Sequence, residues 1–171
     1  MSDTPWWELA YQRLKAHDIR LATHVPDAAL AQLIRRLEED PEIDVVPLAR
    51  EEEGIGVLTG GHLGGCRGVL LMQNSGLGNS VNALAGLAMS YRIPFLMFIS
   101  PRGRLGEFNP SQVPMGRATE GVLASLNIET VTMERLDMVA EQVDQAARTC
   151  FASSLPVALI VSTLLTGGKR G

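Results

Sequence analysis

Short apolar runs alternate with longer segments of helical period along most of this chain. Six runs are rich in β-branched and other apolar residues, as buried strands are. Such alternation is typical of a parallel sheet whose strands are joined by crossover helices. The sequence therefore predicts a three-layer α/β fold, a six-stranded, mostly parallel sheet with helices on both faces. The expected strands are 19–23, 43–48, 68–73, 95–100, 129–132 and 157–162.

Three of the intervening segments have the spacing of amphipathic helices. Apolar residues recur three or four positions apart within 28–37, 81–91 and 139–151. The second segment also concentrates small residues, which let another element approach the backbone closely. They predict either core packing or self-association between subunits. These small residues are Ala83, Ala85, Gly86 and Ala88.

Length and composition predict one globular domain. The chain has 171 residues, of which 46% are hydrophobic and 20% charged, and this balance suits a single domain at 1–165 with a short flexible tail at 166–171. No apolar run approaches the roughly 20 residues that cross a bilayer. The first residues also lack the pattern of a secretory signal. We therefore expect a cytoplasmic protein without a membrane segment.

Charge and cysteine usage exclude further classes. The net charge of −4 comes from interspersed acids and bases, without the basic stripe that would predict binding to nucleic acid. Cys66 and Cys150 belong to no Cys-x-x-Cys pair, so we expect them to be buried apolar side chains rather than a disulfide or a zinc site. No metal ligands are expected in this chain.

Polar segments follow the first four predicted strands, where ligands bind in open parallel sheets. They are 23–27, 49–54, 73–79 and 100–104. The third is the most distinctive, because two glycines permit close backbone approach and polar residues offer donors and caps. It predicts either a ligand cradle or a tight turn that caps the next helix. A Rossmann nucleotide site is disfavoured, since no Gly-x-Gly-x-x-Gly follows the first strand.

Three consecutive glutamates, Glu51, Glu52 and Glu53, begin the helix after the second strand. Acids at this position stabilise the positive end of the helix dipole, which is one interpretation. However, the helix that follows is rich in glycine and almost without charge. We therefore expect at least one of these carboxylates to lie in a buried crevice as a candidate acid or base.

Several motifs together resemble a known family. They are REEEGIG at 50–56, MQNSGLGN at 72–79, SPRG at 100–103, QVPMG at 112–116 and ATE at 118–120. This set, over about residues 25–128, closely resembles the α subunits of sulfopyruvate decarboxylases and the matching half of phosphonopyruvate decarboxylases. The resemblance implies a domain that binds the aminopyrimidine ring of thiamine diphosphate.

The resemblance also implies a partner. In that family a second domain holds the cofactor diphosphate through Mg²⁺ and is marked by Gly-Asp-Gly and a later Asn-Asn, and neither motif occurs in these 171 residues. We therefore expect a separate β subunit that carries this domain and binds Mg²⁺. The implied reaction converts a small anionic 2-oxo acid, sulfopyruvate or phosphonopyruvate, to the aldehyde and CO₂.

The family's activating glutamate lies nine residues before a helical glycine, and Glu51 stands in this relation to Gly60. The resemblance implies that Glu51 hydrogen-bonds N1′ of the pyrimidine and so activates the cofactor. The expected cofactor contacts are Pro26, Glu51, Asn74, Ser75, Gly76 and Asn79. The expected substrate contacts are His24, Asn74, Ser75 and Arg102.

Alternatives remain open at this stage. His24 occupies a position where the relatives have a small residue, and it is expected either to bind the anion or move a proton, or to be a solvated loop histidine. Arg102 suits a tetrahedral oxyanion but also a surface salt bridge. The alternatives for the whole chain are a subunit of another thiamine diphosphate-dependent decarboxylase or carboligase, and a non-catalytic nucleotide-binding regulatory module.

Overall fold

The computed structural model describes residues 4–104 and 106–167. Its strands form one six-stranded sheet in the order β2-β1-β3-β4-β6-β5, and every neighbouring pair is parallel. The predicted α/β class is confirmed, and each predicted strand lies within one residue of the observed bounds. The strands are β1 Ile19–His24, β2 Asp44–Pro47, β3 Arg67–Gln73, β4 Leu96–Ser100, β5 Glu129–Met133 and β6 Val157–Val161.

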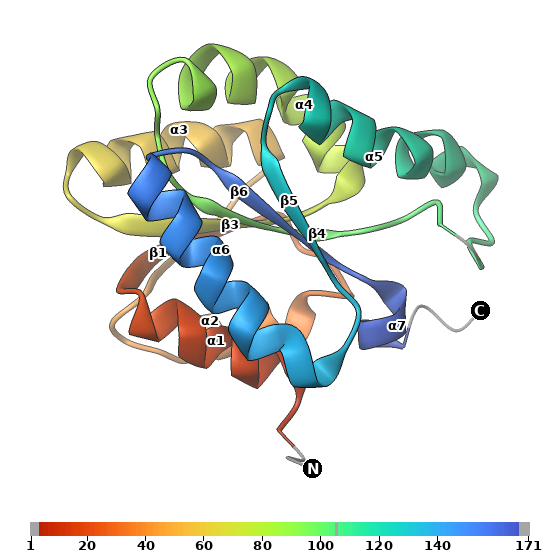
Figure 1. Cartoon of the computed structure of the whole chain (residues 1–171), viewed down its shortest axis with the longest axis horizontal. Helices are drawn as coiled ribbons and strands as arrows, with labels where there is room; N and C mark the ends of the chain where they lie inside the picture. The colour runs from red at the N-terminus through yellow and green to blue at the C-terminus, as the bar shows by residue number, and fades with distance from the viewer. Residues whose placement is uncertain (1–3, 105, 168–171) are drawn as a thin grey trace.

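Helices cover both faces of this sheet, as expected (Figure 1). One face carries α1 Trp6–Ala16, α2 Ala31–Glu38 and α6 Val139–Ser153. The other carries α3 Glu51–Leu63, α4 Asn74–Ala83 with its π-helical continuation Leu84–Met89, and α5 Val113–Ser125. Short 3-10 turns stand at Pro110–Gln112 and Leu136–Met138, and α7 Thr163–Thr166 follows β6.

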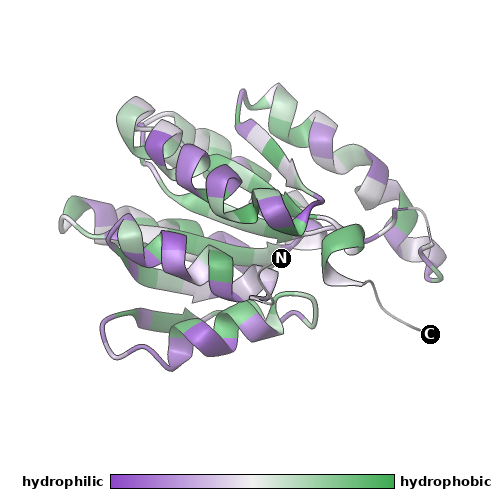
Figure 2. Cartoon of the chain, turned by 60° about the horizontal axis from the view of Figure 1, so that its bottom comes forward, coloured by the Kyte–Doolittle hydropathy of each residue, from purple (hydrophilic) through white to green (hydrophobic). Residues whose placement is uncertain are grey.

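The central strands supply both cores. All residues of β4 and β6 are buried, with alternate side chains entering the two hydrophobic clusters on the two faces. Figure 2 shows the sheet as mainly hydrophobic and the helices as mixed. Full burial of a large apolar side chain stabilises a fold by about 1.5–3 kcal/mol, so the sheet is the rigid base from which the polar loops project.

The segment 73–79 was expected to be a loop, and this expectation is wrong. Helix α4 begins at Asn74, directly after β3, and Gln73 is its extended N-cap residue. Glycine disfavours a helix interior by roughly 1 kcal/mol relative to alanine, so local propensity favoured a loop. The helix forms because tertiary packing requires it here, as the environment of Gly76 shows below.

The small residues around 83–88 have mixed environments. Ala88 is fully buried in the core, whereas Gly86 is exposed and no described atom lies within 4 Å of the place where its Cβ would be. Core packing thus accounts for part of this group. Self-association stays a prediction for the rest.

The C-terminal boundary and the cysteines differ in detail from expectation. Thr166 ends α7 and Gly167 caps it with a φ of +81°, so regular structure continues past 165; residues 168–171 lie outside the described part. Cys150 is buried, and burial raises the pKa of its thiol to about 12. Cys66 is only partly buried, contrary to the prediction. Within the described residues, no helix combines the length and apolar character needed to cross a membrane.

Candidate functional site

The strand order places the start of α3 beside the start of α4. From β1 the chain passes to the edge strand β2 and then returns through α3 to β3, on the other side of β1. This reversal of direction is the switch point at which ligands bind in open α/β sheets. The starts of α3 and α4 therefore meet near the carboxyl ends of β1 and β3, where the Glu51 side chain lies against Gly76.

Two of the three glutamates serve the start of α3. The Glu53 carboxylate accepts hydrogen bonds from the backbone N–H groups of Ala49 and Arg50, at 3.2 and 3.3 Å, in a capping box. Glu52 forms an ion pair with Arg50 at 3.1 Å, and both side chains are well exposed. Helix capping thus accounts for Glu53 and an exposed ion pair for Glu52.

Glu51 has a different environment. It is 9% exposed, and its side chain lies against Gly76 so closely that a Cβ on that glycine would collide with it. Within the described residues, the Glu51 carboxylate forms no hydrogen bond or ion pair. Gly54, one turn further along α3, similarly packs against the buried hydroxyl of Thr23, which also finds no partner there. The contact between α3 and α4 therefore holds a buried acid whose carboxylate can accept hydrogen bonds from a ligand.

Asn74 is engaged by the protein itself. Its Nδ2 donates to the carbonyl oxygen of Arg102 at 2.9 Å and to Thr119 Oγ1 at 3.1 Å, while its Oδ1 accepts from the Arg102 backbone N–H at 3.1 Å. Both donors and one acceptor position are thus used. Asn74 joins β3, the loop after β4 and α5, and in this arrangement its side-chain donors are not free for a ligand.

Two glycines bring the same loop against α5. Gly103 adopts a φ of +75°, and a Cβ there would collide with the backbone of Gln112 and Val113. Gly116 would collide in the same way with the backbone of Arg102 and Gly103. The glycines of the SPRG and QVPMG motifs therefore form one close backbone contact.

Arg102 binds a carboxylate from its own loop. Its Nε and one terminal nitrogen donate to Glu107, each at 2.7 Å, and the Glu107 carboxylate also accepts from the backbone N–H groups of Gly103 and Asn109. The Arg102 guanidinium and these N–H groups hold the pKa of Glu107 well below its ordinary value. Arg102 thus forms the salt bridge that one expectation named, although the pair is partly buried rather than fully exposed, and its anion-binding fork is occupied.

His24 is not a solvated loop residue, contrary to one expectation. It ends β1, is 4% exposed, and neither ring nitrogen finds a hydrogen-bond partner within the described chain. Glu38 on α2 lies 3.8 Å from Nε2. Burial lowers the pKa of His24, against an opposing effect of Glu38. Because α2 covers the sheet face opposite to α3, His24 and Glu51 are not brought together.

The remaining predicted residues are spread along the carboxyl edge. Ser75 Oγ donates to Gln73 at 2.8 Å, whereas Pro26 and Asn79 are exposed. Gln73 in turn lies 3.5 Å from Asp27. The structure thus brings Glu51 and Gly76 together and joins Asn74 to the Arg102 backbone, while the Arg102 guanidinium lies on Glu107.

Sequence reasoning missed three contributors, Asp27, Glu107 and Thr119. Asp27 had a visible signal, an acid at the end of the first polar segment. Thr119 lies within the ATE motif, but its contact with Asn74 spans 45 positions and no local pattern shows it.

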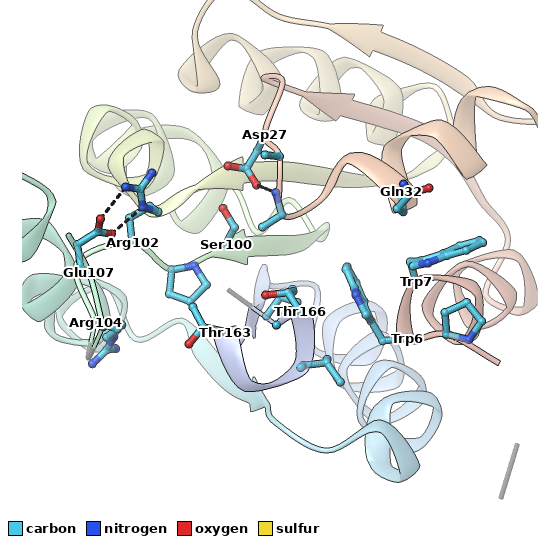
Figure 3. A pocket seen from close by; sticks show the side chains of 18 of the residues that line it. Trp6, Trp7, Asp27, Gln32, Ser100, Arg102, Arg104, Glu107, Thr163 and Thr166 are labelled. Carbon is cyan, nitrogen blue, oxygen red and sulfur yellow. Dashed lines mark hydrogen bonds and ion pairs between the residues drawn. The ribbon is translucent and has the colours of Figure 1, made fainter. Parts of the chain in front are cut away.

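A pocket with a volume of about 680 Å³ opens at the carboxyl edge on the face covered by α1 and α2 (Figure 3). Its walls come from the start of α1, the β1–α2 segment, the loop after β4, and α7. Glu51 does not line it. The pocket lining includes Trp6, Trp7, Asp27, Gln32, Ser100, Arg102 and Thr163.

The fold has a solved counterpart. It superposes on 2-oxoglutarate:ferredoxin oxidoreductase from Magnetococcus marinus, solved with 2-oxoglutarate, coenzyme A and succinyl-CoA bound, with a TM-score of 0.71 over 95% of this chain and 29% of that one. The two sequences are 12% identical, so this likeness defines the class of fold alone. No family model matches the chain.

Curated relatives define the family. The sulfopyruvate decarboxylase subunit alpha of Methanococcus maripaludis is 39% identical over 92% of this chain and 94% of its own length. That of Methanothermobacter thermautotrophicus is 44% identical over 83% and 88%. The phosphonopyruvate decarboxylase of Streptomyces viridochromogenes is 39% identical over 61% of this chain and 27% of its own. The chain belongs to the family of sulfopyruvate decarboxylase α subunits, which confirms the predicted class, a decarboxylase acting as one subunit.

Proposed function

We propose that this chain binds the aminopyrimidine of thiamine diphosphate and, with a separate β subunit, decarboxylates a small anionic 2-oxo acid. Sulfopyruvate is the first choice of substrate and phosphonopyruvate the second, following the names of the relatives. The observation that carries the proposal is Glu51, a buried carboxylate without a protein partner at the switch point of the sheet. Buried polar groups are normally hydrogen-bonded, so an unengaged one predicts a ligand.

The residues present fit the pyrimidine ring. Glu51 is acceptor-only when ionised, which suits contact with a protonated ring nitrogen, and the absence of a side chain on Gly76 lets the Glu51 carboxylate lie directly against the start of α4. When bound, thiamine diphosphate supplies a ring that accepts the electrons released as CO₂ leaves. Glu51 would hold the proton at the pyrimidine nitrogen, and its low exposure strengthens that hydrogen bond.

The proposed substrate contacts differ from those expected from the sequence. Arg102 remains the candidate for the sulfonate or phosphonate, but Glu107 occupies its guanidinium, so the substrate anion has to replace or share this carboxylate. The backbone N–H groups that begin α4 offer neutral donors for the same group, whereas the Ser75 hydroxyl donates to Gln73. The donors of the Asn74 side chain serve the loop instead.

The β subunit is part of the proposal. Among the described residues, no three His, Cys, Asp or Glu side chains gather as a metal site, and the sequence lacks the Gly-Asp-Gly and Asn-Asn motifs. We therefore assign the Mg²⁺ and diphosphate ligands to the β subunit, and propose a cytoplasmic hetero-oligomer.

Reconstitution tests this proposal. The purified chain should show weak or no Mg²⁺-dependent binding of thiamine diphosphate in calorimetry, and binding and CO₂ release from sulfopyruvate should appear together when the β subunit is added. Decarboxylation by this chain alone would overturn the two-subunit assignment. Binding of cofactor to the mixture without CO₂ release from either acid would overturn the substrate instead.

A further inference from the structure

The ion pair between Arg102 and Glu107 has the arrangement of an anion site that is filled by a carboxylate of the same chain. Oε2 of Glu107 accepts from Arg102 Nε at 2.7 Å and from the Gly103 backbone N–H at 2.9 Å. Oε1 accepts from a terminal guanidinium nitrogen at 2.7 Å and from the Asn109 backbone N–H at 3.0 Å. Each oxygen thus receives one charged and one neutral donor. Arginine binds carboxylate and phosphate groups by the same parallel donation.

The backbone that carries these donors is held independently of Glu107. The Asn74 side chain forms two hydrogen bonds with the backbone of Arg102, at 2.9 and 3.1 Å. Gly103 lies so close to the backbone of Gln112 and Val113 that a Cβ on this glycine would collide with them. Arg102 and Gly103 therefore keep their backbone positions when the Glu107 carboxylate is absent or turned away.

Glu107 stands on a segment that has space around it. Its side chain is 6% exposed, whereas the neighbouring residues Gly106 and Phe108 are exposed. Gly106 has a φ of +87°, and no described atom lies within 4 Å of the place where its Cβ would be. The Arg102 guanidinium and the backbone N–H groups hold the pKa of Glu107 well below its ordinary value. Glu107 is therefore ionised near neutral pH.

The pair also lies where a small acid would meet it. Arg102 and Glu107 both line the cavity of about 680 Å³ at the carboxyl edge of the sheet, and Figure 3 shows their charged groups facing each other. A cavity of this volume is large enough for a small organic ligand. A second anion that enters it therefore competes with Glu107 for the same four donors.

We propose that Glu107 is an internal competitor of the substrate anion and thereby a specificity-determining residue. In the free chain its carboxylate fills the four donors, and the sulfonate or phosphonate of the substrate takes them when Glu107 turns away. This inference rests on the proposed function, which supplies the anion. A 2-oxo acid without a second anionic group, such as pyruvate, has nothing with which to displace Glu107, so the competitor discriminates against it.

This role and a purely structural one predict effects of opposite sign. If Glu107 only supports the loop, its removal displaces the Arg102 guanidinium and weakens anion binding. If Glu107 competes with the substrate, its removal increases the fraction of chains whose donors are free. The apparent affinity for an anion then rises by the same factor as that fraction.

A binding experiment on the full-length chain separates the two roles. The probe is methanesulfonate, titrated while the backbone amide resonances of Gly103 and Asn109 are followed by NMR, and methanesulfonamide is the neutral probe of similar shape. Glu107→Gln should bind methanesulfonate about tenfold or more tightly than the parent and show no response to methanesulfonamide, because glutamine is neutral and has one acceptor oxygen. Glu107→Ala should change the affinity in the same direction.

Two further variants control this experiment. Glu120→Gln removes a charge from the ion pair with Arg104 and should bind methanesulfonate as the parent does. Arg102→Ala combined with Glu107→Gln should abolish the gain. Asp27 also acts electrostatically on Arg102, but it is unchanged in every variant and does not affect the comparison. Circular dichroism checks that each variant is folded.

In the assembled enzyme, KM for sulfopyruvate should fall in Glu107→Gln and KM for pyruvate should not. Unchanged or weaker binding of methanesulfonate by folded Glu107→Gln and Glu107→Ala would overturn the inference, and so would an equal gain in Glu120→Gln. If the assembled parent enzyme releases no CO₂ from sulfopyruvate, the proposed function fails, whereas the titration of the chain still decides the role of Glu107.

Discussion

The start of α3 and the loop after β4 lie at the same edge of the sheet but differ in whether their buried polar groups are hydrogen-bonded within the chain. In the loop, Glu107 and the Arg102 backbone, which is held by Asn74 of α4, have their hydrogen-bonding groups filled by the chain itself. At the start of α3, Glu51 is also buried, at 9% exposed, and has no such partner among the described residues. Buried polar groups with hydrogen-bond partners rigidify a structure. A buried polar group without a partner destabilises the fold unless a ligand or another chain pairs with it.

The comparison therefore separates a structural frame, formed by Asn74, Glu107 and Thr119, from a reactive position, Glu51. Substitutions in the frame should act on stability or on the placement of Arg102, and substitution of Glu51 should act on chemistry. The following predictions test this separation.

Glu51→Gln should have the largest effect. Glutamine keeps the shape of the side chain but lacks the negative charge that would hold a proton on the cofactor, so kcat of the assembled enzyme should fall on the order of 10² or more with little change in stability. Hydrogen–deuterium exchange at cofactor C2 measures the affected step. Glu52→Gln is the control and should retain nearly full turnover; normal C2 exchange in Glu51→Gln would contradict the assignment.

Arg102→Ala should have the second largest effect. If the guanidinium binds the substrate anion, KM for sulfopyruvate should rise about tenfold or more, with a much smaller change for pyruvate, which lacks the second anionic group. Arg104→Ala is the matched control, since Arg104 pairs with the exposed Glu120. An equal rise of KM for both acids would show that Arg102 supports the loop rather than the substrate.

Thr119→Val should affect the frame alone. Valine preserves the volume but removes the acceptor of the Asn74 amide, and leaving that buried donor unpaired should lower the free energy of unfolding by about 1–3 kcal/mol. Urea denaturation measures this change, and Thr119→Ser should restore most of it. Loss of turnover without loss of stability would show instead that Thr119, like Glu51, acts on the reaction.

His24 should give the smallest effect, a pH dependence of stability. Its folded pKa is lowered below the ordinary 6.5 by burial, so the unfolded chain binds the proton more tightly. Its contribution is therefore complete above about pH 6.5 and is lost as the pH falls below that value. Thermal unfolding between pH 7 and 5 should show a shallower decline for His24→Gln than for the parent, and parallel curves would rule out this role.

The strands were predictable because full burial leaves continuous apolar runs, as in β4 and β6. The start of α4 was not predictable, because Asn74, Gly76 and Gly78 have low helix propensity. The helix is supported instead by contacts with a glutamate from α3 and a threonine from α5. Pairings between distant positions leave no periodic signal along the chain.

The candidate site was predictable to a similar extent. Position at the helix start selected three glutamates, the resemblance singled out Glu51, and the structure distinguishes the three by burial and capping. The environment of His24 could not be deduced, because one residue at the end of a strand can belong to the sheet or to the loop. The pairing of Arg102 with Glu107 could not be predicted either, because it depends on the geometry of the turn between them.

The two edges of the sheet limit how this chain can join others. Edge strand β2 has four residues and ends at Pro47, which has no N–H to donate, and at the opposite edge the Gln142 side chain covers the carbonyl oxygen of Thr132 in β5. Each edge therefore offers one backbone group fewer to a neighbouring strand. These interruptions make extension of the sheet by a strand of another chain less favourable at both edges.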